Sequence, residues 1–303
     1  MNINETIKNI SIILGTSVSD IEKYVEIFQN KVIVIKYGGH AMGDKKLAHT
    51  FAEDVTLLQK LSIKPVVVHG GGPQIGSMLD KLKIESSFID GLRITNEETV
   101  EIVEMVLSGS INKDIVNKIH AAGGLAIGLS GKDAKLILAN KLTDKFKDPN
   151  SNIEKFLDIG FVGKPIKINP FIINIISDNL MIPIIAPVGF GANNETYNIN
   201  ADTAAGAIAS SLKAERILLL TDVKGVLDSN KKLISNISVT KAESMISDKI
   251  ITGGMIPKIK TCLETVGSGV KAAVIIDGRS PHAILREIFT TGGSGTMIDN
   301  NFE

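Results

Sequence analysis

The chain has 303 residues, 44% of them hydrophobic, and its 33 basic side chains balance 33 acidic ones. This length allows one large or two smaller domains with a substantial core. The balanced charge excludes a global field that would recruit nucleic acid or an anionic membrane, so neither is an expected partner. No apolar run reaches the roughly 18 residues of a membrane span. Cys262 is the only cysteine, which excludes an intrachain disulfide and predicts a soluble protein of the reducing cytoplasm.

The first 30 residues predict a helical arm. Apolar residues recur there at helical spacing, and the pattern is split around Gly15. Acidic residues such as Glu5 and Asp20 argue against a secretory signal or a transit peptide. The arm cannot bury its apolar face alone. It packs either on its own domain or on another subunit, and the sequence leaves both options open.

From residue 31 onwards, short β-branched runs alternate with longer helical patterns, which predicts an α/β fold with a mainly parallel sheet. Strands are expected at Val32–Lys36, Pro65–His69, Leu125–Leu129, Met181–Ala186, Arg216–Thr221 and Ala272–Asp277. Helices are expected at Lys45–Leu61, Pro73–Lys81, Asn96–Leu107, Asn112–Ala122, Ala201–Leu212 and Pro257–Val266. Polar alternation between Ala134 and Asn169 predicts antiparallel hairpins at the sheet edge, where they would form a lid.

Two expected strands end in glycine turns, at Gly38-Gly39 and at Gly70-Gly71-Gly72. Glycines between a parallel strand and a helix let backbone N–H groups approach an anion, and the helix N-terminus adds partial positive charge. Tight turns without a ligand are the alternative, but two such turns on neighbouring strands favour a phosphate site. The chain has no P-loop and no G-x-G-x-x-G motif, which disfavours a P-loop ATPase and a Rossmann dehydrogenase.

Two lysines stand beside glycine turns, and an aspartate lies at the start of a helix. Lys36 ends a strand just before the first turn, and Lys258 follows a Gly-Gly-Met-Ile-Pro segment at an expected helix start. A strand-end lysine is usually only solvated, but beside a glycine turn it can neutralise a transferring phosphoryl group. Asp202 falls in the first turn of another helix. There, either it or Asn200 caps the helix, or Asp202 orients the two lysines by charge-assisted hydrogen bonds.

Taken together, these motifs resemble the amino-acid kinase family, and within it the branch that acts on N-acetyl-L-glutamate, from Val32 to Ile298. The segments Thr221 to Val226 and Asp277 to Thr296 add to five blocks that occur in the family's order. These blocks are Lys36-Tyr37-Gly38-Gly39, His69-Gly70-Gly71-Gly72-Pro73-Gln74-Ile75, Asp90-Gly91-Leu92-Arg93-Ile94-Thr95, Tyr197-Asn198-Ile199-Asn200-Ala201-Asp202 and Gly253-Gly254-Met255-Ile256-Pro257-Lys258.

The resemblance implies a three-layer α/β/α sandwich with a mainly parallel central sheet, a hairpin lid and an N-terminal helical arm. The arm would span residues 1–30 and the kinase domain residues 31–303. Within that domain, residues 31–200 would form an acyl-glutamate lobe with the lid, and residues 201–303 a nucleotide lobe.

The resemblance also implies an activity: ATP-dependent phosphorylation of the side-chain carboxylate of N-acetyl-L-glutamate, a step in arginine biosynthesis. Mg²⁺ would be carried by ATP without an all-protein metal site. A carboxylate needs no general base to attack phosphorus, so lysines, amides and Mg²⁺ suffice. The implied roles are catalysis by Lys36, Lys258 and Asp202, binding of the acid by Gly71, Gly72, Arg93, Asn198 and Asn200, and binding of ATP by Gly38, Gly39, Thr221, Asp222, Lys224 and Gly225.

Two alternatives remain. A sister kinase would act on carbamate, aspartate, glutamate, UMP or aminoadipate, but the Asp90 to Thr95 and Tyr197 to Asp202 blocks favour acetylglutamate. A non-catalytic sensor of arginine or nucleotide would not need intact Lys36, Asp202 and Lys258.

In the family, an N-terminal helix of this kind interlaces dimers into a hexameric ring and accompanies feedback by L-arginine. The resemblance therefore implies a homo-oligomer, either a dimer or a hexamer, with L-arginine as an inhibitor. Tyr24 and His282 would contact this effector. The segment Thr290 to Gly295 lacks the acidic residue that the family often has in this loop, so a carboxylate partner for the guanidinium is missing there.

Overall fold

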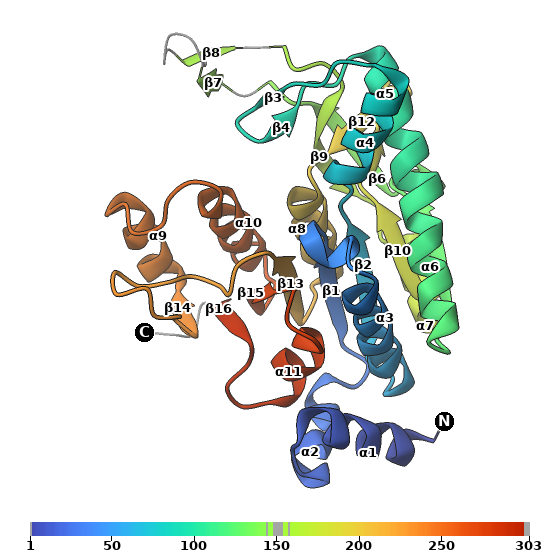
Figure 1. Ribbon diagram of the computed structural model, residues 1–303, viewed down its shortest axis with the longest axis vertical. Helices are drawn as coiled ribbons and strands as arrows, with labels where there is room; N and C mark the ends of the chain where they lie inside the picture. Colours follow the sequence, from blue (N-terminus) through green and yellow to red (C-terminus); the bar gives the residue numbers. More distant parts are fainter. Residues whose placement is uncertain (1, 144, 148–153, 157, 300–303) are drawn as a thin grey trace.

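The computed structural model describes residues 2–143, 145–147, 154–156 and 158–299 (Figure 1). At its centre is an eight-stranded sheet in the order β14-β16-β15-β13-β1-β2-β10-β5. Neighbouring strands are parallel, except that β15 and β16 are antiparallel. The strands are β1 (Val32–Tyr37), β2 (Lys64–His69), β5 (Ala126–Ser130), β10 (Ile182–Ala186), β13 (Arg216–Thr221), β14 (Asn236–Ser238), β15 (Ala272–Asp277) and β16 (Gly295–Asp299).

Each face of this sheet has its own hydrophobic core. On β1, Ile33 and Ile35 point into one cluster and Val34 points into the other, as the alternation of side chains along a strand requires. Helices α3 (Lys45–Lys60), α6 (Asn112–Ala121) and α11 (Ala283–Phe289) contribute to the first cluster. Helices α7 (Phe171–Asp178), α8 (Ala201–Leu212), α9 (Val239–Ser247) and α10 (Met255–Gly267) contribute to the second. The predicted three-layer α/β/α sandwich is therefore confirmed.

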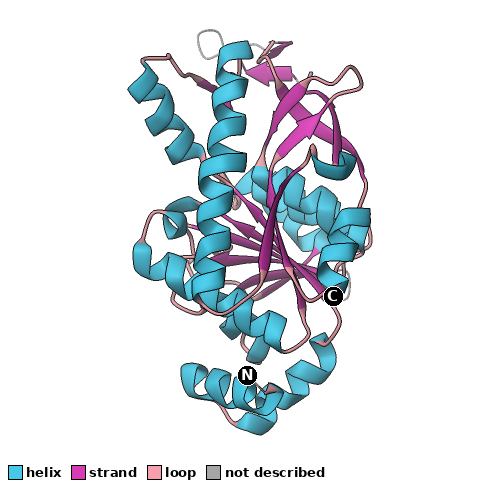
Figure 2. Cartoon of the chain, turned by 90° about the vertical axis from the view of Figure 1, so that its right-hand side faces the viewer, coloured by secondary structure: helices cyan, strands magenta, loops and turns pink. Residues whose placement is uncertain are grey.

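The six strands predicted from the sequence are all present, and their bounds differ by at most one residue at either end. Two predicted helices, however, are joined. α5 (Glu97–Glu104) continues through a π-helical segment, η2 (Met105–Ile111), directly into α6. This long helix runs down the front of the molecule in Figure 2. The prediction of a break near Gly109 was wrong because a wider helical turn accommodates the Ser-Gly-Ser segment without ending the helix.

The N-terminal arm packs on its own domain. It consists of α1 (Ile3–Leu14) and α2 (Val18–Phe28), which are separated by Gly15 in a left-handed conformation. The apolar faces of both helices are buried in the first core cluster, against α3 and α11. Figure 1 shows the arm at the end of the molecule opposite to the pair of strands β7 (Lys145–Lys147) and β8 (Glu154–Phe156). Of the two options that the sequence left open, the structure places the apolar face on the arm's own subunit.

The region from 134 to 169 contains antiparallel strands as predicted, but they do not extend the main sheet. β6 (Ile137–Lys141) and β9 (Val162–Ile168) close into a four-stranded barrel with β11 (Val188–Phe190) and β12 (Thr196–Ile199). β7 (Lys145–Lys147) and β8 (Glu154–Phe156) form a separate pair. The predicted position at the sheet edge was wrong, because β6 and β9 pair with β11 and β12 instead of with the main sheet. The sequence did not show these partners, since β11 and β12 are too short to detect by alternation. Residues 144, 148–153 and 157 of this segment lie outside the described residues.

Between β2 and α5 the chain forms a helix and a hairpin. α4 (Gly72–Leu82) follows the second glycine turn, and a hairpin of β3 (Phe88–Ile89) and β4 (Leu92–Arg93) leads into α5. None of the helices in the described part of the chain is long and apolar enough to cross a membrane.

Candidate active site

The candidate site lies where β1, β2 and β13 end. Lys36 near the end of β1 is in register with Val68 of β2 and with Leu219 of β13. The chain passes from β1 to β2 on one side and later returns to β13 on the other. The carboxyl ends of parallel strands at such a switch point are where open α/β sheets bind ligands.

Asp202 lies between two lysines in this position. Its Oδ1 atom is 3.1 Å from Nζ of Lys36, and its Oδ2 atom accepts a 2.8 Å hydrogen bond from Nζ of Lys258. The side chains of Lys36 and Asp202 are only 11% and 13% exposed. Burial by itself raises the pKa of Asp202, but the charges and hydrogen bonds of both lysines outweigh it, and this pKa is lowered. The three residues carry a net positive charge, which suits an anionic ligand.

The local sequence explains how Asp202 and Lys258 meet. Asn200 caps α8, because its Oδ1 atom accepts hydrogen bonds from the backbone N–H groups of Asp202 and Thr203. One turn later, Gly206 faces α10, where an added Cβ would lie 2.7 Å from Oγ1 of Thr265. The missing side chain lets α10 pack closely on α8, so that Lys258, the fourth residue of α10, reaches Asp202.

The glycine turns form a wall of a cavity of about 220 Å³ next to these charges. An added Cβ on Gly38 would lie 2.9 Å from Nζ of Lys36, and one on Gly39, whose φ is +72°, would lie 2.6 Å from Oδ1 of Asp222. A side chain at either position would displace one of these charged groups, and the positive φ of Gly39 also favours glycine there. The predicted residues that line the cavity are Lys36, Gly38, Gly39, Gly71, Gly72, Asn200, Asp202 and Lys258.

Arg93 reaches the second glycine turn from the β3–β4 hairpin. Its Nη2 atom donates a 3.0 Å hydrogen bond to the carbonyl of Gly72, and Nη1 donates to Oγ of Ser86. The guanidinium also lies 4.6 Å from the ring centroid of Phe88. Burial lowers the pKa of Arg93, against the opposing charge of Asp80. A guanidinium has five N–H donors, so these bonds leave capacity for a carboxylate ligand.

Asn198 on β12 is linked to the same hairpin. Its Nδ2 atom donates a 3.3 Å hydrogen bond to Oγ1 of Thr95, and this hydroxyl donates to the carbonyl of Arg93 at 2.8 Å. The structure thus connects Asn198 and Arg93 through one intervening side chain. Asn200 is not part of this connection, because the Oδ1 atom of its side chain accepts the hydrogen bonds that cap α8.

The predicted nucleotide residues follow the end of β13. Oγ1 of Thr221 accepts a hydrogen bond from the Val223 N–H and donates to the Ile276 carbonyl, which fixes the turn. Asp222 approaches Gly39, and Gly225 has a φ of +140° beside Thr296. Lys224 is exposed. None of these four residues lines the 220 Å³ cavity, although Asp222 approaches Gly39, which does.

Asp277 and Arg279 stand next to this turn, and no role was predicted for them beyond their place in a motif. Nε and Nη2 of Arg279 each donate a 2.8 Å hydrogen bond to the Asp277 carboxylate. These bonds lower the pKa of Asp277 and raise that of Arg279. Because Asp277 is in register with Thr221, the pair lies at the same end of the sheet.

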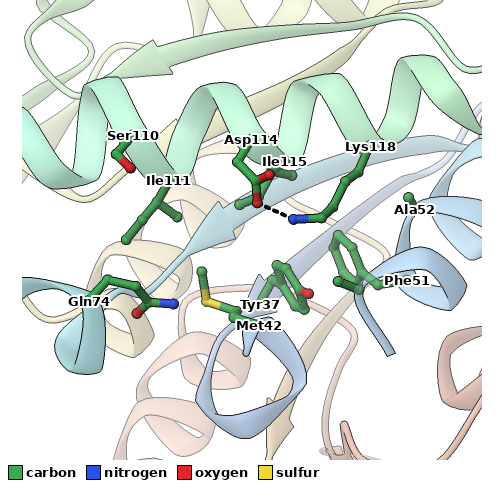
Figure 3. Close-up of a pocket in the computed structure, with 11 residues that line it drawn as sticks. Tyr37, Met42, Phe51, Ala52, Gln74, Ser110, Ile111, Asp114, Ile115 and Lys118 are labelled. Atoms are coloured by element: carbon green, nitrogen blue, oxygen red, sulfur yellow. Dashed lines mark hydrogen bonds and ion pairs between the residues drawn. The ribbon is translucent and has the colours of Figure 1, made fainter. Parts of the chain in front are cut away.

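A second hollow of about 120 Å³ adjoins the site (Figure 3). It lies between α3 and α6 and shares Met42 and Gln74 with the first cavity. The rings of Tyr37 and Phe51 stack in it with their centroids 3.7 Å apart. The sequence did not predict this hollow, because its lining comes from five separate segments.

The two predicted effector residues lie on neighbouring helices. Tyr24 of α2 packs against the first core cluster, and His282 precedes α11, which contacts α2. Nδ1 of His282 is 2.7 Å from Oδ1 of the buried Asp54 on α3. The loop between α11 and β16 contains no acidic residue, but the buried Glu287 of α11 accepts a 2.7 Å hydrogen bond from the Ser294 N–H.

Within the described ranges, no group of three or more His, Cys, Asp or Glu side chains is arranged to hold a metal ion.

The sequence analysis missed His69 and Asn112, which contact each other behind the second glycine turn. His69 lies in one of the motifs, so its position was a usable signal. No sequence signal marked Asn112, because its hydrogen-bond partners are distant in the chain.

Comparison with known proteins identifies relatives over most of the chain. Residues 31–277 match the model of the amino acid kinase family. An acetylglutamate kinase of Rhodospirillum rubrum is 58% identical over 282 residues, covering 93% of this chain and 91% of that protein. One of Gluconobacter oxydans is 57% identical over 275 residues, covering 91% and 93%.

A solved structure supports the same fold. N-acetylglutamate synthase from Neisseria gonorrhoeae, complexed with coenzyme A and N-acetyl-glutamate, aligns with a TM-score of 0.81 at 19% identity. The alignment covers 94% of this chain but only 63% of the synthase chain, and at this identity it shows the fold alone. The family model and the two kinases extend over most of the sequence, and the chain therefore belongs to the amino acid kinase family.

Proposed function

We propose that this protein transfers the γ-phosphoryl group of ATP to the side-chain carboxylate of N-acetyl-L-glutamate, forming N-acetyl-L-glutamyl 5-phosphate for arginine biosynthesis in the cytoplasm. The observation that carries the proposal is Asp202 held between Lys36 and Lys258 at the mouth of a glycine-lined cavity. The substrate follows from the relatives named acetylglutamate kinase, which match over nearly their whole length.

The chemistry needs alignment and charge neutralisation rather than a general base. An ionised carboxylate oxygen attacks the γ-phosphorus, the bond to the β–γ bridging oxygen breaks, and ADP leaves with that electron pair. Lys36 and Lys258 offset the charge that develops on the transferred group and on the leaving oxygen. Asp202 holds both ammonium groups in place, so little reorganisation is needed during the reaction. Mg²⁺ would enter with ATP and supply further charge neutralisation.

The remaining predicted residues are each assigned to one of the two substrates, the acid or ATP. Arg93, Asn198 and Asn200 would fix the amino-acid end of the substrate. Gly71 and Gly72 would border the substrate where it meets the γ-phosphoryl group. Gly38 and Gly39 would approach the phosphates, while Thr221, Asp222, Lys224 and Gly225 would contact the nucleotide. In this proposal residues 31–200 form the acyl-glutamate lobe, residues 201–303 form the nucleotide lobe, and residues 1–30 form the arm.

The test is a kinase assay with a panel of acids. Purified protein with ATP and Mg²⁺ should convert N-acetyl-L-glutamate into an acyl phosphate that hydroxylamine traps as a hydroxamate, with stoichiometric release of ADP. Free glutamate should react poorly, because an ammonium replaces the neutral acetamide. Equal rates with glutamate, aspartate or carbamate would show a sister kinase, and nucleotide binding without turnover would show a sensor.

We also propose that the protein is a homo-oligomer, a dimer or a hexamer, and that L-arginine inhibits it. The outer side of the arm carries Ile12 and Ile27, which are 79% and 53% exposed. At the sheet edge formed by β5, Leu125 and Ile127 are 53% and 39% exposed. Exposed apolar residues along an edge strand, which has one unpaired side, favour contact with another chain. Arginine would bind between α2 and the start of α11, near Tyr24 and His282.

Light scattering separates these possibilities. The full chain should be a dimer or a hexamer, and a hexamer should fall to dimers when residues 1–30 are removed. Activity measured with and without arginine on both proteins tests the effector site. A full-length monomer would contradict the assembly, and an undiminished rate at saturating arginine would contradict the inhibition.

A further inference from the structure

A buried histidine stands directly behind the second glycine turn. His69 is the last residue of β2, its side chain has no exposed surface, and it does not line the 220 Å³ cavity. Its two ring nitrogens face different partners. Nδ1 is 2.9 Å from the carbonyl oxygen of Gly70, and Nε2 is 3.3 Å from Nδ2 of Asn112.

The surroundings of Asn112 decide which nitrogen of the ring carries the proton. Lys113, which can only donate, lies with its Nζ atom 3.3 Å from Oδ1 of Asn112. Nδ2 donates to the carbonyls of Ile184 and Leu129 at 2.9 and 3.2 Å. The amide of Asn112 is therefore oriented with its NH₂ group toward His69. The two hydrogens of Nδ2 are shared among these two carbonyls and Nε2 of His69, so Nε2 faces a donor. Because the Gly70 carbonyl can only accept, Nδ1 carries the hydrogen that is donated to it.

This hydrogen bond fixes the direction of the Gly70–Gly71 peptide. The carbonyl and the N–H of a trans peptide point in opposite directions, and the described residues contain no cis peptide bond. Because the Gly70 carbonyl points back to His69, the N–H of Gly71 points away from it, toward the cavity that Gly70, Gly71 and Gly72 line. The described part of the chain offers this N–H no acceptor of its own.

The long helix confines the same loop from a second side. An added Cβ on Gly71 would lie 2.4 Å from Ile111 and 2.6 Å from Leu107, both in the π-helical segment. Asn112 directly follows this segment, and its amide is enclosed by β5, where an added Cβ on Gly128 would lie 1.8 Å from Oδ1. The loop thus has little room to turn over. One helix supplies both the steric wall and the hydrogen bond that orients His69.

We propose that His69 and Asn112 are positioning residues for phosphoryl transfer, which hold the Gly70–Gly71 peptide so that the Gly71 N–H is aimed at the transferred phosphoryl group. This inference rests on the proposed kinase function. Neither residue touches the reacting atoms, and both act through the backbone. A donor aimed at developing charge before the reaction starts contributes more than one that must first reorient.

His69 is not a proton carrier in this arrangement. Burial lowers its pKa to about 4, against the opposing effect of the bond to Gly70, so the ring is neutral near pH 7. Its contribution should therefore be constant across the neutral pH range, where a general base would produce a titration.

The test compares His69→Asn with His69→Leu. The asparagine amide places an NH₂ group near the position of Nδ1 and keeps the donor to Gly70, whereas leucine removes it. Leucine should lower kcat about 10- to 100-fold, below the 10²–10³ typical for deleting a donor outright, with the KM values of ATP and the acid changed less than about threefold. Asparagine should restore kcat to within about fivefold of wild type. His120→Leu, an exposed histidine on α6, is the matched control and should leave kcat unchanged.

A binding measurement gives the readout that a merely structural role would not move. ADP with aluminium fluoride imitates the transferred group, so His69→Leu should weaken its binding by about the same factor as kcat. Binding of a non-hydrolysable ATP analogue should stay within about threefold. If leucine prevents folding, Asn112→Leu, which removes the donor to Nε2, should show the same selective loss at a smaller size.

Several outcomes would overturn the inference. They are equal kcat values for the asparagine and leucine variants, a loss confined to KM, unchanged aluminium fluoride binding, or a neutral-pH titration of kcat that disappears in the asparagine variant. The substrate assignment fails separately, in the wild-type protein. If wild type prefers another acid, the same variants are compared on that acid, and the difference between asparagine and leucine decides the inference.

Discussion

The two ends of the candidate site are built in different ways. Lys36, Asp202 and Lys258 come from β1, α8 and α10, which belong to the central sandwich and are fixed by its cores. Arg93 and Asn198 come from a hairpin with two-residue strands and from the small barrel. The phosphoryl end is thus held by the fold itself, while the acid-binding end is held by a few side-chain bonds such as those of Thr95 and Ser86. Changes at the two ends should therefore have different kinetic signatures.

The largest effect is expected at the phosphoryl end. Lys36→Ala and Lys258→Ala should each lower kcat by about 10²–10³-fold with little change in KM, because each lysine acts mainly on charge that develops in the transition state. Steady-state kinetics with both substrates measures this. Lys64→Ala is the matched control, since Lys64 is at the opposite end of β2 and pairs with Asp178. A KM effect without a kcat effect would erase the proposed difference between the two ends.

Arg93→Ala tests the acid-binding end. A charged hydrogen bond that is formed equally in the ground and transition states affects binding, so KM for the acid should rise about 10- to 100-fold while kcat changes little. Arg93 also bonds to Gly72 and packs over Phe88, so the melting temperature should be measured in parallel. Arg93→Lys keeps the charge but loses the planar fork and should recover only part of the affinity. A main effect on kcat would mean that the roles of the two ends are exchanged.

The same contrast explains what the sequence could predict. Strands such as Val32–Lys36 and Pro65–His69 are apolar runs followed by glycine turns, and this strong local signal located the phosphoryl end. The barrel strands Val188–Phe190 and Thr196–Ile199 are too short for alternation to show. Their pairing depends on contacts between segments far apart in the chain, such as the close approach of Gly163 to Tyr197. The acid-binding residues were therefore found through motifs, while their supporting partners were not.

The π-helical segment Met105–Ile111 shows a second limit. Ser108, Gly109 and Ser110 have low helix propensity, and this favours a break. The structure continues the helix because Leu107 and Ile111 are buried against Gly71 and the first core. Tertiary packing outweighed local propensity here. The relation of His69 to Asn112 was invisible for the same reason, since their contact joins residues 43 positions apart.

Gly206→Ala tests whether the close packing of α8 and α10 sets the phosphoryl end. The new methyl group would meet Oγ1 of Thr265 at 2.7 Å and push the helices apart. Overpacking of this kind should destabilise the protein by about 1–3 kcal/mol and lower kcat, because Lys258 moves away from Asp202. Gly267→Ala, at the end of α10 with open space around it, should be neutral or stabilising. Urea unfolding and kcat measured on both variants decide the question. Equal stability and equal kcat would show that the helices tolerate the shift.

The smallest effect is expected at the Asp54–His282 pair, which belongs to neither end of the site. Burial raises the pKa of Asp54 to about 6, although the hydrogen bond from His282 opposes this. The same hydrogen bond raises the pKa of His282, with Glu53 adding to the effect and burial and Arg286 opposing it. Both groups therefore bind protons more tightly in the folded chain than in the unfolded one.

The sign of the pH dependence follows from linkage. For Asp54, stability falls as pH rises from its ordinary value of 3.8 to about 6, and for His282 it falls as pH rises from 6.5 through its raised folded pKa. His282→Asn keeps a donor toward Asp54, tolerates the left-handed backbone at this position and does not titrate. Between pH 6.5 and 8 its unfolding free energy should decline less steeply than that of wild type, by at most about 1 kcal/mol because His282 is partly exposed. Chemical denaturation at several pH values measures the difference. If the plots of unfolding free energy against pH are parallel for the two proteins, protonation of the pair is not linked to folding. A changed kcat at pH 7 would show that the pair affects the phosphoryl end.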